Sequence, residues 1–145
     1  MTTAQTIIDI LELERHPEGG WYVQTFRDGE GHGDRAHSTA IYYLLEGGDR
    51  SHWHTVDAVE IWHFHAGAPL ELSLSEDGAS ERKLLLGADL SAGERPQGVV
   101  RRGEWQSARS LGEWTLVSCT VSPGFEFSGF RMAPAGWRPG MPLDP

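Results

Sequence analysis

The chain has 145 residues, 39% of them apolar, which suits one domain with a core of its own, and we expect residues 1–145 to form it. Its formal net charge is −9 and Lys83 is its one lysine, which argues against binding to nucleic acid or to an anionic membrane surface. The single cysteine, Cys119, excludes an internal disulfide, and no signal-peptide pattern or long apolar run is present. The sequence therefore predicts a soluble, cytoplasmic protein.

The first segment has the pattern of a short amphipathic helix. Ala4, Ile7, Ile8 and Leu11 recur at helical spacing, and a threonine at position 2 or 3 can cap the first turn. The stretch His16–Gly20, with a proline and two glycines, predicts the end of the helical segment and a sharp turn.

The rest of the chain is predicted to be almost entirely β. The 18 glycines and 8 prolines suit many short strands, and turn signals recur every 8 to 12 residues, as in a sandwich or barrel. A polar loop, Gly29–Asp34, is a candidate lid or dimer contact, and the proline-rich tail from Ala133 is expected to lie on the surface. The expected strands are 21–28, 39–45, 51–55, 59–65, 70–75, 82–86, 98–101, 105–108, 115–121 and 125–132.

The triplet His52-Trp53-His54 carries the strongest chemical signal. In a strand, residues i and i+2 point to one face, so both imidazoles are expected on the same side. Pairing with the next strand would place Glu60 opposite them. Two imidazoles and a carboxylate suit a divalent metal ion, and they equally suit a general base with an orienting partner.

The remaining histidines are expected to be less important. His63 and His65 are also spaced i, i+2 but should face away from the predicted site, as a solvated or interface pair or a second metal site. His16, His32 and His37 lie in expected loops and are predicted to be surface residues.

His52-x-His54, then Glu60 and Gly67, resemble the first sequence motif of the cupin superfamily. The wider text from His16 to Trp137 resembles its small, functionally uncharacterised Cupin_5 subfamily, through the stretches HPEGGWYVQTFRD, STAIYYLL, SHWHTVDAVEIWHFHAGAPLELSL, GERPQGVV and WQSARSLGEWTLVSCTVSPGFEFSGF. The resemblance implies an all-β fold with a short N-terminal helix, a double-stranded β-helix (a jelly-roll-like, RmlC-like barrel), assembled as a homodimer.

The second cupin motif normally supplies one more histidine ligand. At that place this chain reads Arg101–Gln106, so Gln106 falls where the histidine would be. An amide oxygen is a weak ligand for transition metals compared with imidazole. The resemblance therefore implies His52, His54, Glu60 and Gln106 as metal ligands if a metal is bound, and this substitution argues against it, as does the longer spacing before the glutamate.

The sequence is compatible with three functions. The first is a metal-independent epimerase or isomerase acting on a small polar, carbohydrate-like molecule, by resemblance to nucleotide-sugar epimerases of the same superfamily. In that hypothesis His52 or His54 removes a proton next to a carbonyl, Glu60 sets the tautomer and Tyr43 returns the proton.

The second function is a metal-dependent oxygenase or isomerase that uses the ligands named above. The third is a non-catalytic binding protein, with Trp62, Phe64 and Trp105 as an aromatic wall around a small molecule. Arg27 and Arg131 are candidate anchors for an anionic ligand, or else members of surface ion pairs.

Overall fold

The computed structural model describes residues 2–29 and 33–143. Its elements are α1 (Ala4–Leu11), β1 (Glu14–Arg15), β2 (Trp21–Arg27), β3 (Thr39–Glu46), β4 (Arg50–Val56), β5 (Val59–Gly67), β6 (Leu70–Ser75), β7 (Arg82–Leu86), the 3-10 turn η1 (Leu90–Ala92), β8 (Gln97–Val100), β9 (Trp105–Ser110), β10 (Trp114–Ser122), the 3-10 turn η2 (Phe127–Gly129) and β11 (Phe130–Met132).

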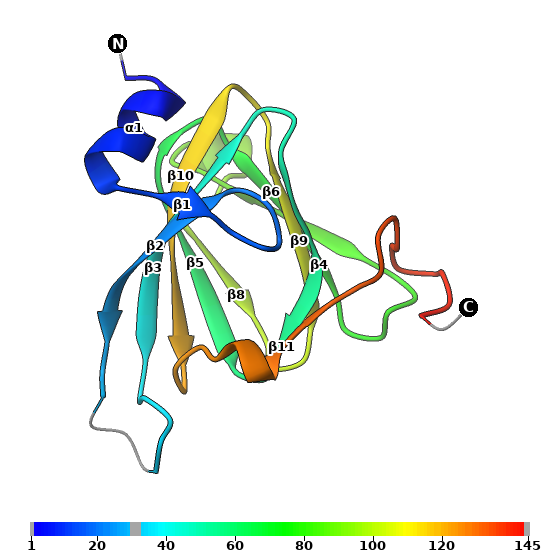
Figure 1. The fold of residues 1–145 in the computed structure, drawn as a ribbon. Coiled ribbons are helices and arrows are strands. Elements are labelled where there is room, and N and C mark those ends of the chain that lie inside the picture. The colour runs from blue at the N-terminus through cyan, green and yellow to red at the C-terminus, as the bar shows by residue number, and fades with distance from the viewer. Residues whose placement is uncertain (1, 30–32, 144–145) are drawn as a thin grey trace.

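The strands form two antiparallel sheets that enclose the main core. One sheet has the order β1-β2-β3-β10-β5-β8 and the other β11-β4-β9-β6-β7. Figure 1 shows the two sheets facing each other as the walls of a barrel, with α1 outside it. The predicted all-β fold with a short N-terminal helix is confirmed.

The main core lies between the sheets because apolar residues alternate along the facing strands. Leu70, Leu72 and Leu74 of β6 are fully buried and belong to the same cluster as Tyr43 and Trp62 of the other sheet. This core fills one half of the barrel and leaves the other end to the polar groups described below.

Helix α1 covers the outer face of the six-stranded sheet. Thr3 caps it, because its hydroxyl oxygen accepts the backbone N–H of Thr6 at 3.1 Å. Ile7 and Ile8 are buried against Leu44 of β3, as the helical spacing predicts. None of the helices in the described part of the chain is long and apolar enough to cross a membrane.

The segment after β10 differs from the expectation. The predicted strand 125–132 is wrong over its first half, because Phe127–Gly129 forms a 3-10 turn and only Phe130–Met132 pairs with β4. The tail then crosses the outer face of the five-stranded sheet. There Trp137, only 3% exposed, packs against Trp53 and Trp105. Part of the predicted lid loop, residues 30–32, lies outside the described residues, as does His32.

Two glycines offer a matched test of how tightly the turn at His16–Gly20 is held. Gly19 (φ +108°) and Gly48 (φ +89°) both have left-handed backbones, but a methyl group on Gly19 would lie 2.1 Å from the carbonyl oxygen of Arg50, whereas one on Gly48 meets nothing within 4 Å. Gly48→Ala should cost about 1–2 kcal/mol of unfolding free energy from its backbone alone. Gly19→Ala should cost about 1–3 kcal/mol more, because a close-packed neighbour must move. Urea unfolding of both variants checks this, and equal losses would contradict the close packing of the turn on β4.

Candidate functional site

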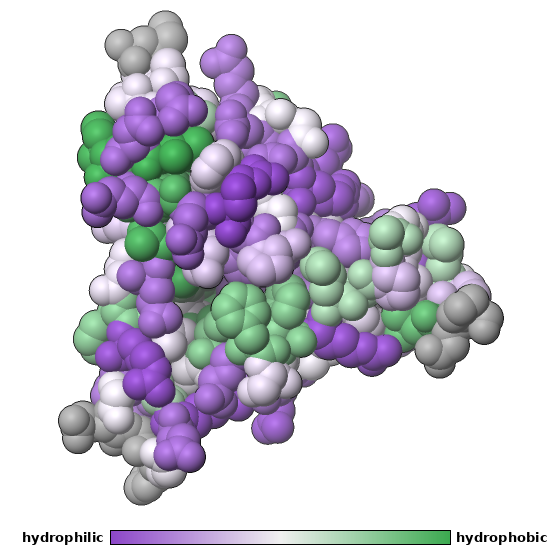
Figure 2. All heavy atoms as spheres, in the orientation of Figure 1, coloured by the Kyte–Doolittle hydropathy of each residue, from purple (hydrophilic) through white to green (hydrophobic). Residues whose placement is uncertain are grey.

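A cavity of about 170 Å³ opens at the end of the barrel that the apolar core does not fill. Its inner end is polar and its outer part is apolar and aromatic. Figure 2 shows apolar side chains gathered in the middle of the face between β2 and β4. The lining residues are Glu14, His16, Glu18, Tyr22, Val23, Gln24, Thr39, Ile41, His54, Val56, Glu60, Cys119, Val121, Phe125 and Phe127.

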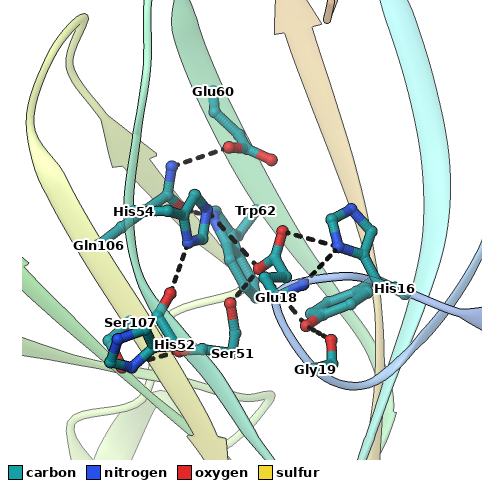
Figure 3. Close-up of polar contacts among 11 residues, drawn as sticks. His16, Glu18, Gly19, Ser51, His52, His54, Glu60, Trp62, Gln106 and Ser107 are labelled. Carbon is teal, nitrogen blue, oxygen red and sulfur yellow. Dashed lines mark hydrogen bonds and ion pairs between the residues drawn. The ribbon is translucent and has the colours of Figure 1, made fainter. Parts of the chain in front are cut away.

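A bulge in β4 decides which histidine of the His-x-His pair reaches the cavity. The pairing of β4 with β9 shifts between Ser51 and His54, which breaks the alternation of the strand. Ser51 and His54 therefore both point into the barrel, and His54 is 2% exposed. His52 points outward, with its Nε2 3.0 Å from the carbonyl oxygen of Pro134. The expectation that His52 and His54 share a face is wrong for this reason (Figure 3).

The turn at His16–Gly20 enters the barrel end and supplies two further titratable groups. It is tied to β4 by the backbone N–H of His52, which donates to the carbonyl oxygen of Glu18 at 2.8 Å. His16 is 7% exposed and lines the cavity, so its prediction as a surface residue is wrong. The proline and glycines do form the predicted turn. This turn folds inward, so its side chains lie in the interior.

Glu18 lies at the centre of the polar contacts in Figure 3. Its Oε2 accepts a hydrogen bond from the Ser51 hydroxyl and lies 3.4 Å from the hydroxyl of Tyr43 and 3.6 Å from Nε2 of His54. Its Oε1 lies 3.3 Å from Nδ1 of His16. Burial raises the pKa of Glu18 to about 8, and only the hydroxyls of Ser51 and Tyr43 oppose this effect. The carboxyl is therefore protonated at neutral pH.

The two cavity histidines are held in opposite tautomers. His16 Nδ1 accepts the backbone N–H of Glu18 at 3.1 Å, so the proton of the neutral ring is on Nε2. His54 Nδ1 donates to the carbonyl oxygen of His52 at 2.7 Å, so its Nε2 is unprotonated. Burial lowers the pKa of His16 to about 4 and also lowers the pKa of His54, which keeps both rings neutral at neutral pH. One ring thus offers an N–H donor and the other a basic nitrogen.

Glu60 is fixed by a short chain of hydrogen bonds across the barrel. Its Oε1 accepts from Nε2 of Gln106 at 2.8 Å, and Oε1 of Gln106 accepts the indole N–H of Trp62 at 2.8 Å. Burial raises the pKa of Glu60 to about 7, while the neighbouring His54 works in the opposite direction. The buried thiol of Cys119 also bonds Glu60, and burial raises its pKa well above the usual range, so the sulfur is not a thiolate.

The other predicted groups of the site lie outside the cavity lining. Tyr43 is 1% exposed, and its hydroxyl donates to the carbonyl oxygen of Gly19. Trp62 and Phe64 pack in or against the main core, and Trp105 belongs to the cluster under the tail. The rings that do line the cavity are Tyr22, Phe125 and Phe127.

The two arginines proposed as anion anchors also lie elsewhere. Arg27 is exposed on β2 and bonds the carbonyl oxygen of Asp34 at 3.3 Å. Arg131 lies over the ring of Trp105 at 5.6 Å. His63 and His65 face outward as expected, bonded to Thr120 and Ser118 of the neighbouring strand.

The side chains present do not form the metal-ligand set that the resemblance implies. His52 faces outward, and the amide oxygen of Gln106 accepts the indole N–H of Trp62. Within residues 2–29 and 33–143, no three His, Cys, Asp or Glu side chains lie close enough together to hold a metal ion. His54 and Glu60 do line the same cavity, but as members of a hydrogen-bonded acid–base cluster.

Among the lining residues that sequence reasoning missed are His16 and Glu18 and the three rings of Tyr22, Phe125 and Phe127. The available signal was indirect: His16 and Glu18 belong to the first stretch that carried the family resemblance, HPEGGWYVQTFRD. A histidine and a glutamate beside a proline and two glycines suggest an exposed turn. Nothing local in the sequence shows that this turn packs into the end of the barrel.

The comparisons with known proteins agree with this architecture. The family model Cupin_5, described as cupin superfamily (DUF985), matches residues 5–133. A crystal structure of a protein from Shewanella oneidensis is 39% identical, with a TM-score of 0.87 over 91% of this chain and 85% of that one. A hypothetical protein from Leishmania major is 32% identical, with a TM-score of 0.80 over 90% and 86%. No curated protein matches the chain.

A more distant similarity concerns the fold alone. A variant of oxalate decarboxylase from Bacillus subtilis superposes with a TM-score of 0.62 at 13% identity, over 81% of this chain and 29% of that one. The barrel, the matched family model and the two closer structures lead to one conclusion: the chain belongs to the Cupin_5 family of the cupin superfamily.

Proposed function

We propose that this protein is a metal-independent isomerase that moves a proton next to a carbonyl group of a small molecule bound in the barrel. The observation that carries the proposal is the arrangement of His16 and His54, buried in one cavity in opposite tautomers with Glu18 between them. An enolisation needs a base for the C–H proton, a donor for the carbonyl oxygen and an acid.

Each of these roles has one group suited to it. Nε2 of His54 is the base, and it takes the proton from the carbon beside the carbonyl. The C–H electron pair becomes the C=C bond of the enol, while the carbonyl electron pair moves to the oxygen. Nε2–H of His16 donates to that oxygen, and the protonated Glu18 supplies the proton it gains. In a substrate with a hydroxyl group on the carbon that lost the proton, His54 then returns this proton to the former carbonyl carbon, while the hydroxyl proton passes to the Glu18 carboxylate and its oxygen becomes the new carbonyl.

Glu60 supports this chemistry without touching the carbonyl. Its negative charge favours the imidazolium that forms when His54 accepts the proton, because the Coulomb interaction with Glu60 raises the pKa of His54. The hydrogen bond from Gln106 holds the carboxylate in place. Tyr43 no longer serves as the acid, since its hydroxyl is bonded to the backbone and burial raises its pKa well above the usual range.

The protonation state of Glu18 can be checked through stability. A carboxyl with a folded-state pKa of about 8 and an ordinary value of 4.5 stabilises the fold fully below pH 4.5, and this contribution is lost as the pH rises towards 8. Unfolding free energy should therefore fall between pH 5 and pH 8 by at most about 4 kcal/mol more in the wild type than in Glu18→Gln. Chemical denaturation at both pH values measures the difference. Parallel profiles would show that Glu18 is ionised in the fold. Glu60 and His16 remain in both proteins, so their own titration contributes to both profiles.

The reaction itself is tested by proton exchange with solvent. Wild-type protein in D₂O should exchange the hydrogens beside the carbonyl in at least one member of a panel of small aldehydes and ketones, followed by proton NMR. His54→Gln should lower that exchange at least about 100-fold, because it removes the base. His65→Gln, a change to an outward-facing histidine, is the matched control and should leave the rate unchanged.

The pH dependence of this exchange follows from the same assignments. Loss of the acid form of Glu18 should lower the rate as the pH rises through about 8. If members of the panel bind in the cavity and none of them exchanges hydrogen, the result contradicts the isomerase and favours a binding protein.

A further inference from the structure

The charged groups of the cavity all have the same sign. None of the described residues lining it is lysine or arginine, and three of them are glutamates, Glu14, Glu18 and Glu60. The other titratable groups that face it are His16 and His54, which are neutral, and Tyr22 and Cys119, whose pKa values are raised by burial. The cavity thus has no lysine or arginine to balance a negative charge, and ionisation of Glu18 or Glu60 makes it more negative.

The arginine beside the aromatic part of the cavity is already paired. Arg35 bonds the carbonyl oxygen of Gly124, next to Phe125, but its guanidinium holds both carboxylate oxygens of Asp57, at 2.7 and 3.0 Å. It also lies 3.6 Å from Glu126. Its charge is therefore balanced outside the cavity, and an anionic ligand would meet carboxyls without a cation to receive it.

One N–H donor faces the cavity without a protein partner. His16 is 7% exposed, its Nδ1 is occupied by the backbone N–H of Glu18, and its Nε2–H has no hydrogen-bond partner among the described residues. Since no described side-chain nitrogen or oxygen is buried without a partner, this N–H is open to the cavity, where water or an oxygen atom of a ligand can accept it. The cavity therefore suits a ligand with an oxygen acceptor at His16 and a group complementary to the carboxyl of Glu60.

We infer that the substrate of this cavity is a small amino-carbonyl compound, bound with its nitrogen as a cation against Glu60 and its carbonyl oxygen at His16 and Glu18. The inference deepens the proposed function and rests on it for the location of the substrate. The rings of Tyr22, Phe125 and Phe127 add a surface on which an ammonium group is attracted. The net charge of −9 favours the approach of cations.

The size of the cavity limits the substrate. Its volume of about 170 Å³ is the share of about six water molecules in the liquid, so the part of a ligand held inside it has fewer than about ten non-hydrogen atoms. An ammonium group next to the carbonyl also makes the neighbouring C–H more acidic, which suits a base as weak as a buried imidazole.

Binding of a cation has a consequence that a neutral ligand lacks. A positive charge beside Glu60 favours its ionised form, so this carboxyl, whose pKa is about 7, loses a proton when an amine binds near pH 7, while Glu18 keeps the proton that the reaction uses. Binding of the amine should release protons to the buffer, a neutral analogue should release almost none, and an anion should have the opposite effect.

Three ketones of nearly equal size separate these cases: aminoacetone (a cation, freshly dissolved), hydroxyacetone (neutral) and pyruvate (an anion). Titration calorimetry at pH 7 in two buffers of different ionisation enthalpy gives affinity and proton release together. Aminoacetone should bind about tenfold or more tightly than hydroxyacetone, with proton release, and pyruvate should bind most weakly.

Two single-residue variants test whether the amine binds against Glu60. Glu60→Gln should weaken aminoacetone about tenfold and leave hydroxyacetone within about threefold, because only the cation uses the charge. Glu113→Gln, an exposed change in the turn before β10, is the control and should alter neither. If Glu60→Gln does not fold, the relative affinities of the three ketones for the wild type and the proton release on binding still test the proposal.

The outcomes separate the two proposals. No preference for the amine, no proton release, or tightest binding of pyruvate overturns the amine substrate. If one of these results is obtained and hydroxyacetone still exchanges hydrogen with D₂O, the isomerase remains supported. Amine binding with proton release but without exchange in D₂O would instead support the ligand class and contradict the isomerase.

Discussion

The polar end of this barrel depends on one carboxyl group. Glu18 comes from a turn that is not part of either sheet, yet its oxygens meet the Ser51 hydroxyl, the Tyr43 hydroxyl and both cavity histidines. These contacts, and the backbone bond from His52 to Glu18, hold the turn inside the barrel end. Without these contacts the turn would not be held in the barrel end, and His16 would be exposed to solvent.

The price of this arrangement is the burial of a carboxyl without a cation. Because no lysine or arginine lines the described cavity, Glu18 remains folded mainly in its protonated form. Protein interiors normally avoid such groups, and their occurrence together in a cleft is characteristic of sites that perform chemistry. Glu60, held by Gln106, is a second case in the same cavity.

The fold was predictable because the spacing of the apolar residues and the positions of glycine and proline are enough to indicate it. The spacing of Ile7 and Ile8 predicts the helix, and alternating apolar residues between glycine-rich turns predict the strands. The site was only partly predictable. His54 and Glu60 were found, but the rule that i and i+2 share a face fails at a bulge, and nothing local to His52 reveals one. The inward turn that carries His16 and Glu18 is a tertiary feature, set by contacts with residues far along the chain.

The line of hydrogen bonds from Glu60 through Gln106 to the indole of Trp62 gives the barrel an internal optical probe. Indole emission responds to nearby charge, and Trp62, 1% exposed, is shielded from the changes in solvent that affect surface tryptophans. A change in the charge of Glu60 reaches this ring through a single amide. Ionisation of Glu60 should therefore change the emission of Trp62, one of the six tryptophans of the chain.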